Sequence, residues 1–110
     1  MKDKAKYLHD ILESITYIGE YLGKRRSFEI YTNKRQLRRS VERELEIIGE
    51  AMNNLLKLDP NISISDSRKI VGLRNIIIHA YDSVDDALVW DIIENHLPLL
   101  KTEITELLKN

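Results

Sequence analysis

The positions of the hydrophobic side chains predict helices along most of this chain. The first apolar series advances in steps of three or four residues and comprises Leu8, Ile11, Ile15, Ile18 and Leu22. This spacing places one apolar stripe along a helix. We expect the helix to span residues 3–22 and to end at Gly23, because glycine readily adopts the left-handed conformation that closes many helices.

A second apolar series has the same spacing and predicts the longest helix of the chain. Its members are Leu37, Val41, Leu45, Ile48, Met52 and Leu55. The helix should end before Asp59, because Pro60 disfavours helical geometry in the residue that precedes it.

A third helix is expected to lead into a run of three isoleucines, residues 76–78. Ser65 or Asp66 can cap its N-terminus, and it should end between His79 and Asp82. This helix is apolar on most sides. We therefore expect the isoleucine run to be buried and one helix face to need a second chain.

The last part of the chain predicts a helix interrupted by proline. Ser83 and Asp86 have the spacing of a capping box, with Asp in place of Glu. The apolar stripe that follows comprises Ile93, Leu97, Leu100, Ile104 and Leu107. Pro98 should kink this helix or split it in two.

No segment alternates between apolar and polar residues as a strand does, so the pattern predicts an all-α bundle of four to five helices. The chain has 110 residues, of which 43% are hydrophobic. This length and composition fit a single domain, residues 1–110, with a small core. A bundle of this size has limited core to bury, and we expect a homodimer.

Composition narrows the possible chemistry. The chain has no cysteine, which excludes disulfides, thiolate catalysis and zinc–thiolate sites. His9 and His96 lack the spacing of metal ligands, so we expect no metal and no cofactor. No apolar stretch approaches the ~20 residues that cross a bilayer, and we expect a soluble, cytoplasmic protein without membrane contact.

Charge is segregated along the chain although the net charge is only -1. Residues 24–43 hold eight basic and two acidic side chains, a local excess of six positive charges. Lys34, Arg35, Arg38 and Arg39 are therefore candidates for RNA-backbone contacts, and Tyr21, Phe28 and Tyr31 could stack on unpaired bases. Alternatively, this basic segment docks an acidic protein partner.

The segment from Arg74 to Tyr81, Arg-Asn-Ile-Ile-Ile-His-Ala-Tyr, has the strongest functional pattern. Arginine presents a fork of donors that suits phosphate, and histidine titrates near neutral pH. On an ideal helix Arg74 and His79 would point about 140° apart. Their convergence would require the helix to unwind near His79, or a partner subunit to complete the site.

A structural interpretation of the same residues exists. His79 could support a helix C-terminus, Arg74 could pair with a carboxylate, and Tyr81 could pack with its hydroxyl in water. Trp90 is most simply an anchor of the core or of a dimer interface.

The segment resembles the Arg-x4-6-His motif of the HEPN superfamily, and with Tyr81 it resembles the signature of the HepT branch. Residues 44–51, Glu-Leu-Glu-Ile-Ile-Gly-Glu-Ala, are similar to the second helix of that family. Residues 89–93, Val-Trp-Asp-Ile-Ile, followed by Leu97 and Pro98, are similar to its last helix. The resemblance therefore spans nearly the whole chain.

The resemblance implies the toxin of a toxin–antitoxin pair, a metal-independent ribonuclease whose dimer joins two Arg-His motifs in one cleft. It also implies an MntA-like nucleotidyltransferase antitoxin that attaches AMP to Tyr81. Because this chain has no glycine-serine segment followed by paired aspartates, AMP transfer must come from the partner.

These residues permit a metal-independent reaction on RNA. His79 would act as general base or acid and Arg74 would stabilise phosphoryl oxygens. Asn75 could hold the imidazole or contact the phosphate, or it could be a plain surface residue. The alternative function is a non-catalytic helical subunit that presents Tyr81 and the basic segment to the nucleotidyltransferase, or binds nucleotide.

Overall fold

The computed structural model describes residues 2–78 and 85–109. In chain order the elements are α1 (Lys2–Leu22), α2 (Phe28–Asn33), α3 (Arg35–Leu58), α4 (Ser67–Ile78), α5 (Asp86–Asp91), the π-helical turn η1 (Ile92–His96) and α6 (Leu97–Lys109). The described residues contain helices and no strand, which confirms the all-α prediction. None of the described helices is long and apolar enough to cross a membrane.

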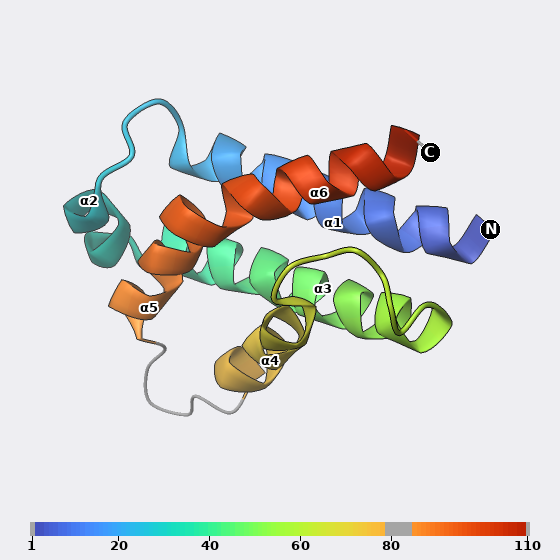
Figure 1. Ribbon diagram of the computed structural model, residues 1–110. Helices are drawn as coiled ribbons and strands as arrows, with labels where there is room; N and C mark the ends of the chain where they lie inside the picture. The colour runs from blue at the N-terminus through green and yellow to red at the C-terminus, as the bar shows by residue number, and fades with distance from the viewer. Residues whose placement is uncertain (1, 79–84, 110) are drawn as a thin grey trace.

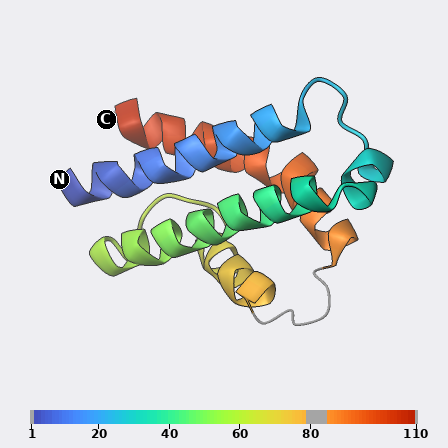
Figure 2. The same ribbon diagram turned by 180° about the vertical axis from the view of Figure 1, so that it is seen from behind.

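Helices α1, α3 and α6 run alongside one another and form the body of the bundle (Figures 1 and 2). The predicted stripes of α1 and α3 face inward. Val41, Leu45, Ile48, Met52 and Leu55 are fully excluded from solvent, and the whole stripe of α1 is buried. The boundaries also agree with the sequence: α1 ends at Leu22, where Gly23 has a φ of 67°, and α3 ends at Leu58.

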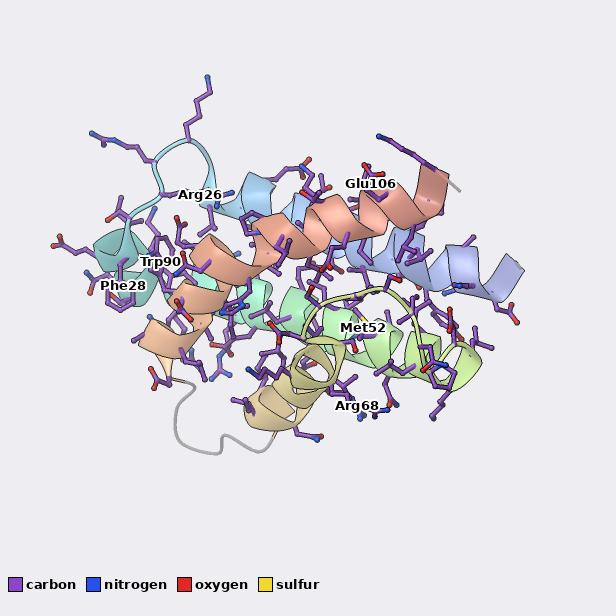
Figure 3. The ribbon with its side chains drawn as sticks, viewed as in Figure 1. Arg26, Phe28, Met52, Arg68, Trp90 and Glu106 are labelled. Atoms are coloured by element: carbon purple, nitrogen blue, oxygen red, sulfur yellow. The ribbon has the colours of Figure 1, made fainter. Side chains whose placement is uncertain are left out.

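Helix α2 is not among the predicted helices, and its residues fall in the basic segment, residues 24–43. Ser27 caps this short helix by accepting a hydrogen bond from the Ile30 amide at 3.3 Å. Tyr31 of α2 is fully buried, and its ring centroid lies 5.5 Å from that of Trp90. Phe28 lies against the same indole at 6.0 Å, as Figure 3 shows. Trp90 is thus a core anchor that ties α5 to α2.

Helix α4 begins directly after Asp66, close to the predicted start. The Asp66 carbonyl accepts a hydrogen bond from the Ile70 amide at 3.0 Å. Asp66 has a φ of 56°, a left-handed conformation that aspartate tolerates better than most residues. Ser65 faces α6 instead of capping α4: its amide and hydroxyl donate to the Glu103 carboxylate at 2.9–3.1 Å.

The proline in the last helix has the expected disruptive effect, by a specific route. The Leu97 amide donates to the Ile92 carbonyl, five residues back, and Pro98 has no amide to continue the α-helical ladder. A π-helical turn separates α5 from α6 as a result. The predicted cap Ser83 lies outside the described residues; Asp85 caps α5 by accepting from the Leu88 amide at 3.1 Å.

Candidate functional site

Arg74 and Asn75 lie near the C-terminal end of α4, and both side chains are exposed. No carboxylate in residues 2–78 or 85–109 forms an ion pair with Arg74. The structural interpretation of Arg74 as half of a salt bridge therefore finds no support among these residues. An exposed guanidinium of this kind can bind a phosphate.

Gly49 of α3 determines how closely α4 approaches α3, and therefore where the backbone of Arg74 lies. A Cβ atom on Gly49 would lie 3.1 Å from the Cβ and the backbone nitrogen of Arg74, and 3.1 Å from the Ile70 carbonyl oxygen. Only glycine leaves room for this contact. The backbone of Arg74 is thereby held against α3 while its side chain stays in solvent.

The other two residues of the predicted motif, His79 and Tyr81, lie outside the described residues. The structure thus places Arg74 and Asn75 on one helix, and the convergence of Arg74 with His79 remains a prediction.

The isoleucine run is less buried than the sequence suggested. Ile76 is 45% exposed and Ile77 is partly buried. The prediction of a buried run was wrong for Ile76, because α4 packs on α3 through its opposite face, where Ile70 and Arg74 contact Gly49.

Ile76 forms one wall of a groove of about 460 Å³. The groove lies between α4 and the α5–η1–α6 segment, and its lining includes Ile70, Leu73, Ile76, Leu88, Ile92, Leu99, Leu100 and Glu103. Leu88 is 39% and Leu99 51% exposed. Such a concentration of exposed aliphatic side chains is typical of a surface that another molecule covers.

The four basic residues predicted to contact RNA differ in their surroundings. Lys34, Arg35 and Arg39 are exposed, whereas Arg38 is half-buried. Nη1 of Arg38 donates a hydrogen bond to the Thr32 carbonyl, and its Nε lies 4.0 Å from a carboxylate oxygen of Asp86. Among the described residues, Arg38 therefore has more contacts with other protein groups than Lys34, Arg35 or Arg39 has.

The chain matches a model of the family described as ribonuclease HepT-like over residues 11–107. It belongs to the HepT-like ribonuclease family.

Several curated proteins are similar along almost their whole length. A protein of Methanocaldococcus jannaschii, named as a candidate RNase, is 36% identical over 107 residues, which is 94% of each chain. One of Thermococcus cleftensis, named as a probable ribonuclease HepT, is 35% identical, again with 94% of each chain covered. A candidate RNase of Caldanaerobacter subterraneus is 34% identical over 99% of this chain and 97% of its own. No solved structure gives a significant match.

The aromatic residues of the HepT-like chain do not all have the role that the sequence suggested. Tyr31 cannot stack on a base, because it is fully buried beneath Trp90. Tyr21 is 41% exposed and stacks on Tyr17, while its hydroxyl donates to Glu44 at 2.9 Å. Phe28 is 42% exposed, although one side of its ring packs against Trp90. Of the three predicted stacking residues, Tyr21 and Phe28 keep accessible ring surface.

Glu42 is a buried carboxylate on α3, and burial raises its pKa although Arg39 lies 3.8 Å away. A raised pKa means that the folded state binds the proton more tightly than the unfolded chain. The contribution of Glu42 to stability therefore falls as the pH rises through the ordinary carboxylate range and above it. We expect Glu42→Gln to be more stable than the wild type at neutral pH.

Urea unfolding at about pH 4 and about pH 7.5 tests this expectation. The advantage of Glu42→Gln should shrink at the lower pH. Glu50→Gln, an exposed change on the same helix, should alter stability little at either pH. A Glu42→Gln variant that is less stable than the wild type at neutral pH would show that the ion pair with Arg39 outweighs the cost of burial.

Two features of this HepT-like chain are not predicted from its sequence: the close packing at Gly49 and the half-buried position of Arg38. A glycine in the middle of a long amphipathic helix is a signal of close packing that could have been used. Among the described residues no cluster of three or more potential metal ligands occurs.

Proposed function

We propose that this HepT-like chain is a metal-independent endoribonuclease and the toxin of a toxin–antitoxin pair. Membership of the ribonuclease family and the exposed, unpaired state of Arg74 among the described residues support the proposal together. The observation that carries it is the second, because an arginine held against α3 through its backbone, with a guanidinium that is exposed and unpaired within residues 2–78 and 85–109, is poised for an external anion.

In the proposed reaction His79 removes the proton from a ribose 2′-hydroxyl, whose oxygen attacks the adjacent phosphorus. The bond from phosphorus to the 5′-oxygen breaks, and that oxygen takes up a proton from a second acid, which a partner subunit's histidine could supply. Products are a 2′,3′-cyclic phosphate and a 5′-hydroxyl. Arg74 stabilises the charge on the phosphoryl oxygens, and Asn75 orients the imidazole or the phosphate.

We propose that two copies assemble through the groove between α4 and the α5–α6 segment. Ile76, Leu88 and Leu99 expose aliphatic surface there, and Arg74 lies on the same helix as Ile76, two residues earlier. A two-fold axis at this groove would bring the two α4 helices, each with its own Arg74, to the same interface. In this arrangement a partner subunit would complete the site, so that Arg74 and His79 can converge without unwinding of the helix.

The exposed basic residues Lys34, Arg35 and Arg39 are proposed to contact the RNA backbone. Such contacts give affinity without sequence selectivity and weaken with salt. The same surface could receive an acidic face of the antitoxin.

We propose that an MntA-like nucleotidyltransferase silences the toxin by transferring AMP to the Tyr81 hydroxyl, with release of pyrophosphate from ATP. The nucleotide adds bulk and negative charge where an anionic RNA must bind. Tyr81→Phe removes the acceptor oxygen and should abolish this control.

Controlled expression in a bacterial host tests the proposal. Wild type should arrest growth and fragment cellular RNA, and co-expression with the proposed MntA-like nucleotidyltransferase should prevent both effects. Tyr81→Phe should stay toxic in the presence of the partner. Purified wild type should cleave RNA in excess chelator. Harmless expression of wild type, with soluble protein that carries no AMP and cleaves no RNA, would favour the non-catalytic partner subunit instead.

A further inference from the structure

Arg38 joins three helices at the end of the bundle where α5 begins. It belongs to the first turn of α3, its Nη1 donates to the Thr32 carbonyl of α2, and its Nε faces the carboxylate of Asp86 in the first turn of α5 at 4.0 Å. About a quarter of each charged side chain is exposed, 27% for Arg38 and 29% for Asp86. Partial burial strengthens such a contact relative to one in bulk water.

An aromatic contact holds α5 near its other end. The indole of Trp90 packs against the buried ring of Tyr31 and against Phe28 of α2, and the labelled side chains of Phe28 and Trp90 lie together in Figure 3. Helix α5 is thus held near its start by Arg38 of α3 and near its end by the aromatic rings of α2.

The placement of α5 matters for the proposed reaction because of chain connectivity. Only residues 79–84 separate the end of α4 from Asp85, the cap of α5. The candidate base His79 and the proposed modification site Tyr81 belong to that connection. Gly49 sets the position of α4 on one side of it, and the contacts of Arg38, Tyr31 and Trp90 set the position of α5 on the other.

We propose that Arg38 is a positioning residue, which anchors α5 to α2 through Asp86 and Thr32, and that it is not a phosphate contact. The proposal rests on the proposed ribonuclease function and revises the prediction from sequence that Arg38 binds RNA. The guanidinium is needed because it reaches two partners at once. A lysine has the charge but only one ammonium group, which cannot occupy both places.

Three variants separate anchoring from RNA contact in steady-state cleavage of a defined RNA. Anchoring predicts that Arg38→Lys and Asp86→Asn each lower kcat about 10-fold with KM nearly unchanged. A phosphate contact predicts that Arg38→Lys is nearly active, and that Asp86→Asn binds RNA more tightly because a negative charge is lost. The matched control is Arg39→Ala, exposed and one residue away, which should raise KM and reduce the salt slope of RNA binding by about 1.

Amide hydrogen exchange gives a readout that needs no activity. In Arg38→Lys and Asp86→Asn the amides of residues 87–91 should exchange about 10-fold faster than in the wild type, with those of α1 unchanged. Unchanged exchange in α5, or an Arg38→Lys variant with wild-type kcat, would overturn the proposal. If the wild type cleaves no RNA under any condition, the proposed function fails, and the exchange of α5 still decides whether Arg38 anchors that helix.

Discussion

Replacing Arg74 with alanine is expected to lower the rate of RNA cleavage by about 10²–10³-fold. The guanidinium is exposed and pairs with no carboxylate among the described residues, so its loss should change the free energy of unfolding by no more than about 0.5 kcal/mol. Single-turnover cleavage of a short RNA in excess chelator measures the rate. Urea unfolding of the same preparations shows whether the fold is intact.

Arg68→Ala is the matched control, because Arg68 is an exposed arginine on the same helix and lies six positions earlier. It should leave the rate within about two-fold of the wild type. Arg74→Lys should recover only part of the activity, since an ammonium cannot donate two parallel hydrogen bonds to a phosphate. An Arg74→Ala variant with full activity would remove Arg74 from the proposed reaction.

Replacing Gly49 with alanine should destabilise the protein by about 1–3 kcal/mol, the usual cost of forcing extra volume into a packed interface. Its new methyl group would meet the backbone of α4 and the Cβ of Arg74 at 3.1 Å. Backbone atoms cannot move aside as a flexible side chain can, so α4 must shift as a whole. That shift would carry the Arg74 side chain with it, and we expect cleavage to fall as well.

Gly72→Ala is the matched control for Gly49→Ala, because the two changes should alter stability in opposite directions. Gly72 lies on α4 and lines the groove proposed as the dimer interface, and a Cβ there would meet nothing within 4 Å in its own chain. Helix propensity alone favours alanine over glycine by about 1 kcal/mol, so Gly72→Ala should raise the melting temperature. For a domain of this size 1 kcal/mol corresponds to about 4–8 °C. If Gly49→Ala were stabilised to the same extent, the close approach of α4 to α3 would not constrain this position.

The helical framework could be predicted from the sequence because its signals are local. Repeats of three and four residues located α1 and α3, and Gly23 and Pro60 marked their ends. Helix α2 has only six residues, too few for a repeat to become visible, and charged neighbours surround it. The helix depends on the packing of Tyr31 against Trp90, a contact between residues far apart in the chain.

The candidate site was only partly predictable for a similar reason. Residue types and spacing single out Arg74 and Asn75, and the structure places both on the surface of α4. Whether Ile76 is buried depends on what covers the groove, which no property of the isoleucine run decides. Arg38 and Arg39 are equivalent in the sequence, yet they differ in burial because only one of them faces α2 and α5.

The π-helical turn at Ile92–His96 holds one residue more than an α turn would. In a regular α-helix, adding or removing one residue rotates everything beyond it by about 100°. Deleting one residue within the π turn would instead allow a regular helix from Asp91 into Leu97, with α5 in nearly the same orientation about its axis. Trp90 would then keep its place beside Tyr31. A one-residue deletion should therefore be accommodated more readily here than in the rest of α5 or α6, and gaps in alignments of related sequences should gather at this turn.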